Sequence, residues 1–133
     1  MLRYPSLLTA LVLIAACGSE PEPAGPSVSF GTPEDGAEVS APVQVQMLAD
    51  GVAVSPAGTF EDNSGHFHIL VNAPFIPAGS VIPADSAHIH YGDGSTEVSL
   101  DLPPGEHTLR LQLADGAHIA MDGLQDEIRI TVR

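Results

Sequence analysis

The sequence predicts an all-β protein, an antiparallel immunoglobulin-like β-sandwich of about seven strands. Three observations support this prediction. Helical periodicity is nearly absent, apolar and polar residues alternate along the chain, and Pro- and Gly-rich turns separate short apolar segments. With 13 Gly and 12 Pro among 133 residues, turns are frequent enough to keep every segment short. Short alternating strands at this spacing are typical of two packed antiparallel sheets.

Seven segments are expected to form strands, because each combines alternation or β-branched residues with nearby turn residues. These segments are 28–30, 43–47, 66–71, 87–91, 96–102, 107–113 and 127–132. The second shows the pattern most clearly, with Val43, Val45 and Met47 separated by glutamines. Asp50 and Gly51 follow this strand, and an Asp-Gly pair predicts a hairpin there.

Alternation also assigns side chains to the two faces of a strand. In the third segment Phe67, Ile69 and Val71 form the more uniformly apolar set, so we expect them to face the core. His66 and His68 then lie on the outer face of the sheet or at its rim.

Residues 1–16 are predicted to be a secretory signal peptide. Arg3 precedes the apolar run LLTALVLIAA, which is shorter than the ~20 apolar residues of a permanent membrane-spanning helix. Small residues then lead to Cys17, the only cysteine, and this order resembles a bacterial lipobox. The resemblance implies cleavage before Cys17 and lipid on that residue. Gly18 after it, in place of Asp, implies the outer membrane, facing the periplasm. The alternative is an ordinary signal peptide followed by an unpaired cysteine.

Residues 17–27 are expected to tether this lipid to one folded domain, residues 28–133. The tether is rich in Pro, Glu, Gly and Ser and offers nothing to bury. The formal net charge is −13, and the four basic residues are all Arg. This charge excludes nucleic acid as a partner and opposes binding to anionic lipid surfaces. It attracts divalent cations and basic partners, although solubility is the commoner reason for such a charge.

Two His-x-His pairs are the strongest functional signal in the chain. Residues i and i+2 of a strand project from the same face, so each pair brings two imidazoles together. Paired imidazoles suit copper, zinc, nickel and iron. We expect a copper or zinc site built from His66, His68 and His90, with His88 or His118 as a further ligand.

Other residues near these pairs have two interpretations. Asp93, Glu97 and Asp115 are available as ligands or as acceptors for the ring N–H groups of the ligands. Met121 is either a soft ligand for Cu(I) or a packing residue.

The alternative role for the histidines is structural, because a neutral imidazole can hold a loop with one donor and one acceptor. His107 is expected to act in this way. It shares the inward parity of Leu109, Leu111 and Leu113 and lies at a strand corner where an aromatic side chain often bonds back to the chain.

Catalysis is not expected. The sequence has no Gly-x-Ser-x-Gly elbow, no Gly-rich phosphate loop after a strand and no convincing pair of general acid and base. The prediction is therefore a non-catalytic binding domain on an envelope lipoprotein. One alternative is a structural or protein-interaction module of the envelope. The other is a metal-dependent hydrolase or redox enzyme, which needs an open coordination position and an acid or base such as Glu97.

Three stretches together resemble a bacterial family, the domain of unknown function 4399. They are SGHFHILVN, IPADSAHIHYGDGSTEVSLDLPPGEHTLRLQLADGAHIAM and EIRITV. The family's usual pattern runs GHHHLLID, HFGxGQTE and PGxHTLQLxxGDxxH, and the resemblance covers residues 30–132. It implies export of the protein and brings no established activity. The residues placed on family positions are His66, His68, His90, Thr96, Glu97, His107, Asp115 and His118. The departures are Phe67, Asn72, Ser95 and Met121.

Overall fold

The computed structural model describes Gly18, residues 21–22 and residues 24–133. The predicted signal peptide and Cys17, the predicted site of lipid attachment, lie outside these residues. Within the described part, the predicted tether before Ser27 forms no strand or helix. A search of the same residues found no helix long and apolar enough to cross a membrane.

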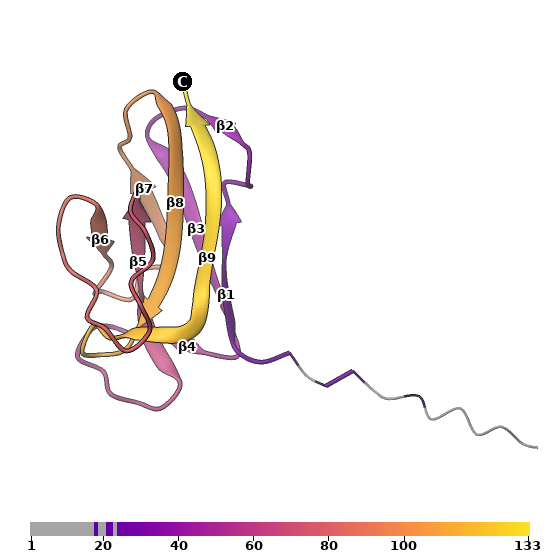
Figure 1. The fold of residues 1–133 in the computed structure, drawn as a ribbon, viewed down its shortest axis with the longest axis vertical. Helices are drawn as coiled ribbons and strands as arrows, with labels where there is room; N and C mark the ends of the chain where they lie inside the picture. Colours follow the sequence, from indigo (N-terminus) through magenta and orange to yellow (C-terminus); the bar gives the residue numbers. More distant parts are fainter. Residues whose placement is uncertain (1–17, 19–20, 23) are drawn as a thin grey trace, which may run out of the picture.

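In the part of the chain that the structure describes, nine strands form two sheets (Figure 1). The smaller sheet has the order β1-β3-β7, and the larger has the order β2-β9-β8-β5-β4, with β6 paired to β5. The strands are β1 (Ser27–Thr32), β2 (Glu38–Val39), β3 (Val43–Asp50), β4 (Ala53–Val54), β5 (Ser64–Val71), β6 (His88–His90), β7 (Glu97–Leu100), β8 (Gly105–Ala114) and β9 (Ala120–Val132).

The predicted all-β sandwich is confirmed, although it has nine strands rather than seven. The two additional strands, β2 and β4, contain two residues each and pair in parallel with β9 and β5. A two-residue strand is too short to show alternation. The prediction of a hairpin at Asp50 and Gly51 is wrong. Gly51 has a φ of 68° and leads from β3 into β4, which pairs in the other sheet.

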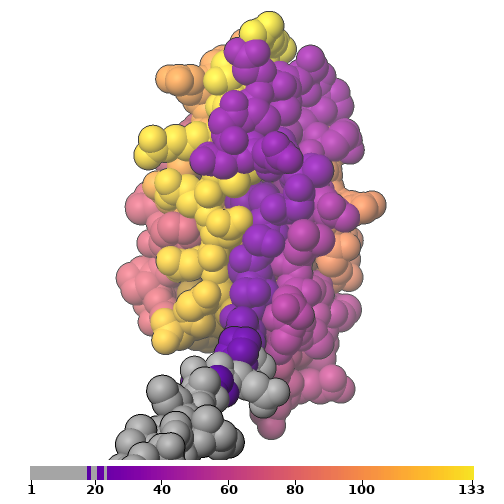
Figure 2. Space-filling view, turned by 90° about the vertical axis from the view of Figure 1, so that its right-hand side faces the viewer, coloured from indigo at the N-terminus to yellow at the C-terminus, as the bar shows by residue number. Residues whose placement is uncertain are grey.

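The core lies between the sheets and is apolar, as predicted. Phe67 and Ile69 are fully buried in it, and Val71 packs against it, so alternation assigned the faces of β5 correctly. Figure 2 shows the indigo surface of β1 between the yellow surface of β9 and the purple surface that includes β3. β1 pairs with β3, and its Phe30 N–H donates to the Asp126 carboxylate of β9 at 2.9 Å. This strand therefore connects the two sheets at one side.

The outer face of β5 and β8 is not exposed. The segment between β5 and β6 covers it, and the carboxamide of Gln112 accepts from Ile76 N–H and donates to Ile76 C=O, both at 2.9 Å. The Arg110 guanidinium donates to Ala73 C=O at 2.6 Å in the same segment. His66 and His68 lie on this outer face, one of the two predicted positions, and not at a rim of the sheet. Because the segment covers the face, both residues are 0% exposed.

Candidate metal centre

β5 supplies the buried half of the site. His66 and His68 project from the same face of this strand, and their Nε2 atoms lie 3.0 Å apart. β8 flanks β5 on one side, pairing His68 with Gln112, and β6 flanks it on the other. Strands on both sides and the covering segment above together remove the two imidazoles from solvent.

β6 supplies the third histidine. His90 is the register partner of His68, so the two side chains share a face of the sheet. The His90 ring centroid lies 4.9 Å from that of His66 and 5.1 Å from that of His68. Unlike them, His90 is exposed. The N–H of Tyr91 donates to the C=O of Phe67 at 3.1 Å and holds the end of β6 beside β5.

The turn between β8 and β9 supplies the fourth histidine. His118 has a φ of 64°, a left-handed conformation that is unusual for a residue with a side chain. The Asp115 carboxylate stabilises this turn by accepting from Ala117 N–H at 2.9 Å and Ile119 N–H at 3.0 Å. The result is that His118 Nε2 lies 3.1 Å from His90 Nε2.

The four imidazoles therefore converge from three separate segments of the chain. Their ring centroids are 4.8 to 6.0 Å apart in all six pairs. One nitrogen from each of His66, His68 and His90 can be chosen so that all lie within 4.8 Å of one another. In a tetrahedral zinc site with Zn–N of about 2.0–2.1 Å, ligand nitrogens are about 3.3 Å apart. The two Nε2 pairs, His66–His68 at 3.0 Å and His90–His118 at 3.1 Å, are each close to this spacing.

The site favours neutral imidazoles, the form that binds metals. Burial, followed by the charges of His90 and His118, lowers the pKa of His66 to about 4, against a smaller raising effect of Asp115. Burial and the neighbouring histidines, His66 first, lower the pKa of His68 to about 3. The pKa of His90 is also lowered, first by burial and then by His118. At neutral pH these three rings are unprotonated and keep a lone pair for a ligand bond.

The structure places His88 outside this convergence. Its Nδ1 lies 2.7 Å from the Asp85 carboxylate, which also accepts from the N–H groups of Ala87 and His88. The equal parity of His88 and His90 predicted a shared site. The turn that begins at Asp85 instead ties the His88 ring to its own carboxylate.

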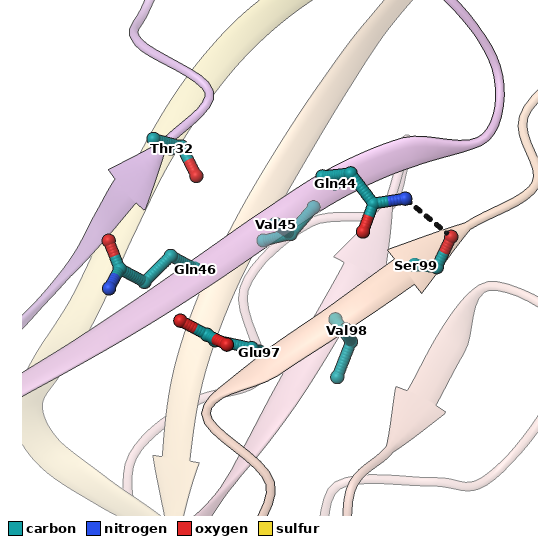
Figure 3. Close-up of a pocket in the computed structure, with 7 residues that line it drawn as sticks. All are labelled: Thr32, Gln44, Val45, Gln46, Glu97, Val98 and Ser99. Carbon is teal, nitrogen blue, oxygen red and sulfur yellow. Dashed lines mark hydrogen bonds between the residues drawn. The ribbon is translucent and has the colours of Figure 1, made fainter.

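The other residues that were predicted near the histidines have different positions in the structure. Asp115 shapes the His118 turn, and Asp93 accepts from Ser95 in the turn after β6. The histidines of β5 and β6 belong to the larger sheet, whereas Glu97 is on β7 of the smaller one. Figure 3 shows it with Gln44, Gln46 and Ser99 in a shallow polar pocket of that sheet. Met121 packs against the core cluster, which agrees with its packing interpretation.

His107 holds a corner, as predicted. Its Nε2–H donates to Pro103 C=O at 2.8 Å, which leaves Nδ1 to accept from the Asn72 carboxamide at 3.0 Å. The same Asn72 accepts from Thr108 N–H at 2.9 Å. Both ring nitrogens of His107 are thus occupied by the chain itself.

Sequence reasoning missed one residue that shapes the site. A Cβ on Gly92 would lie 2.3 Å from Cε1 and 2.6 Å from Nε2 of His90, so the ring rests directly on the glycine backbone. The only signal in the sequence was a glycine two residues after His90, and glycine is also common in ordinary turns.

Comparison with solved structures supports the fold. An endo-β-1,4-mannanase from Thermotoga petrophila is similar, with 17% identity and a TM-score of 0.50 over 84% of this chain and 20% of that one. The present chain thus spans one fifth of the length of that enzyme, and the likeness concerns the fold alone. No curated protein sequence matches the chain.

Comparison with protein families gives a match over residues 45–133, which contain every histidine of the chain. The matching family is described as a domain of unknown function (DUF4399). Because this match covers more than half of the sequence, the protein belongs to the DUF4399 family.

Proposed function

We propose that this protein is a non-catalytic, envelope-anchored binding domain that holds one divalent transition metal ion, copper or zinc. The proposed ligands are His66, His68, His90 and His118. One observation carries the proposal: four imidazoles from β5, β6 and the turn between β8 and β9 meet, with two Nε2 pairs at 3.0 and 3.1 Å.

The hydrogen bonding of the site supports a role of these histidines as metal ligands over a role in holding loops. A histidine that holds a loop bonds to backbone or amide groups, as both nitrogens of His107 do. In the cluster, by contrast, the Nε2 atoms face one another. The Nδ1 atoms of His66 and His68 are buried and have no hydrogen-bond partner among the described residues. Neither Nδ1 therefore holds a loop, unlike the ring nitrogens of His107.

The donor set favours divalent ions. Imidazole nitrogen suits Zn²⁺, Cu²⁺ and Ni²⁺, whereas thiolate and thioether sulfur select Cu(I). The methionines of the described residues, Met47 and Met121, are both part of the core packing between the sheets.

Isothermal titration calorimetry of residues 27–133, which contain all nine strands, tests the proposal. We expect one equivalent of Cu²⁺ or Zn²⁺ to bind at neutral pH. A His68→Ala, His90→Ala variant should lose this binding, because it removes one buried and one exposed ligand. His88→Ala is the matched control and should bind as the wild type does. Equal heats from the wild type and the double variant would refute the proposal.

The competing function is a structural or protein-interaction module of the envelope. It predicts that His→Ala changes in the cluster lower stability to the same extent with and without metal. Metal binding predicts that added ion raises the melting temperature of the wild type only, because a ligand stabilises the state that it binds. Thermal melts of the wild type and His68→Ala, with and without Zn²⁺, separate the two functions.

The proposed location is the outer membrane, facing the periplasm, with lipid on Cys17. The support is the apolar run and small residues before Cys17, together with Gly18 after it. A lipid-anchored chain should incorporate radiolabelled palmitate and sediment with membranes, whereas a Cys17→Ala variant should do neither. Membrane fractionation of cells that express the two full-length chains checks this expectation.

A further inference from the structure

We infer that the four-histidine site is a carrier site, which takes up and releases its ion as cargo while the domain stays folded. This inference rests on the proposed metal binding. It separates this site from structural zinc sites, in which the metal supplies the folding energy and its removal unfolds the chain.

The first argument is that the folding core lies on the other face of β5. Phe67 and Ile69 enter the apolar cluster between the two sheets, while His66 and His68 point away from it. That cluster joins residues from both sheets, including the fully buried Leu109, Leu111 and Leu113 of β8. Apolar burial is the main stabilising contribution to folding, and here it does not depend on an ion.

The second argument is that hydrogen bonds of the chain itself hold each segment that bears a ligand. The β5–β8 ladder fixes β5, and it pairs six residues of each strand. Tyr91 N–H to Phe67 C=O and Val71 N–H to Ala87 C=O hold the two ends of the β6 segment. The Asp115 carboxylate holds the turn of His118. The ligand geometry is therefore built in advance, and the release of an ion breaks none of these bonds.

The third argument is the asymmetry of the ligand set. His66 and His68 are fully buried, whereas His90 is exposed and His118 half-buried. Since β8, β6 and the covering segment enclose His66 and His68, an ion approaches past His90 and His118, the more accessible pair. A hydrated divalent ion or a small chelate can thus bind His90 and His118 first and reach the buried pair afterwards. On release, the ion leaves the buried pair first and stays bound to His90 and His118, where a chelator can reach it.

Chelator transfer tests the inference. Residues 27–133 are loaded with one equivalent of Zn²⁺, freed of excess ion and mixed with excess 4-(2-pyridylazo)resorcinol, which changes colour on binding zinc. We expect complete transfer within seconds to minutes, at a rate that increases with chelator concentration. The far-ultraviolet circular dichroism and the slow amide exchange of β8 and β9 should stay unchanged throughout. His118→Asn should release the ion at least tenfold faster, because it removes one ligand of the more accessible pair.

Two results would overturn the inference. One is loss of the β-sheet signal as the zinc leaves, which would make the ion structural. The other is transfer that is independent of chelator concentration and as slow as global unfolding. Both differ from a failure of the proposed function, in which no zinc stays with the protein after loading. In that case the inference falls with the function on which it rests.

Discussion

His118 and His90 place their Nε2 atoms 3.1 Å apart, although the backbone of His118 is held in the left-handed conformation at a φ of 64°. For a residue with a Cβ this conformation costs about 1–2 kcal/mol. Gly and Asn adopt it more readily, and either would close the turn that Asp115 stabilises. The fold therefore keeps a histidine where the backbone alone would favour another residue, which points to a use for its imidazole.

Replacing His118 by Asn should separate metal binding from folding. Asn relieves the backbone, so we expect the free energy of unfolding without metal to stay the same or rise by up to about 1 kcal/mol. Metal affinity should fall at least tenfold, because one of four ligands is lost. Urea denaturation and calorimetry measure the two quantities. A loss of more than 1 kcal/mol of stability without metal would show that His118 serves the turn instead.

The buried pair predicts a specific dependence of stability on pH. Folding lowers the pKa of His66 to about 4 and that of His68 to about 3, from 6.5 in the unfolded chain. Between these values the unfolded state binds more protons than the folded state, so stability rises with pH. The contribution is complete above about pH 7 and is lost as the pH falls from 6.5 towards 3.

A variant with both residues changed to Leu isolates this contribution from that of the carboxylates. Its free energy of unfolding, measured in urea at several pH values, should fall less than that of the wild type between pH 7 and pH 4. An equal fall for the wild type and the Leu variant would contradict the low pKa values of His66 and His68.

Alternation explains why half of the site could be predicted from the sequence. The i, i+2 rule placed His66 and His68 on one face of a strand, and it gave the correct core face of β5. It could not show that this outer face is buried. The segment from 72 to 87 that covers it has no periodicity, and its position depends on hydrogen bonds with Arg110 and Gln112.

The other half of the site depends on contacts between distant residues. His118 lies in a turn, where strand parity has no meaning, and the Asp115 carboxylate determines its direction. His88 and His90 have the same parity, yet the Asp85 carboxylate binds the ring of His88. Spacing along the chain therefore identifies which histidines share a face, while side-chain hydrogen bonds decide which of them meet.

Gly92 predicts a positioning effect on the exposed ligand. A Cβ at this position would lie 2.6 Å from His90 Nε2, closer than van der Waals contact, and the imidazole is the part free to move. We expect Gly92→Ala to lower metal affinity roughly 10- to 100-fold, the range seen when a group that orients a ligand is changed. Stability without metal should stay within about 0.5 kcal/mol of the wild type.

The Cu²⁺ electron paramagnetic resonance spectrum gives a second measurement, because a displaced His90 changes the nitrogen hyperfine pattern. His88→Ala is the control, since its ring bonds to the Asp85 carboxylate and not to the four-histidine cluster. Wild-type affinity and an unchanged spectrum for Gly92→Ala would show that the ring position does not depend on this glycine.

His107 gives the opposite expectation from the cluster histidines. Its two ring nitrogens bond to Pro103 C=O and to the Asn72 carboxamide, and the side chain is 8% exposed. Changing His107 to Ala leaves these partners unpaired and opens a cavity, so we expect a loss of about 2–3 kcal/mol in the free energy of unfolding. Metal affinity of the folded fraction should be unchanged.

Comparing His107→Ala with His68→Ala tests whether the two histidines have different roles, one at a corner of the fold and one as a metal ligand. His68→Ala removes a proposed ligand together with a group whose Nδ1 is buried without a partner among the described residues, so its cost without metal should be smaller than that of His107→Ala. Urea denaturation measures the stability of both variants, and zinc titration measures their metal binding. We expect His107→Ala to lose mainly stability and His68→Ala to lose mainly zinc binding. If His107→Ala abolished zinc binding while leaving stability intact, the division into corner and ligand histidines would be wrong. If both variants lost stability equally and neither changed zinc binding, His68 would be a structural residue like His107.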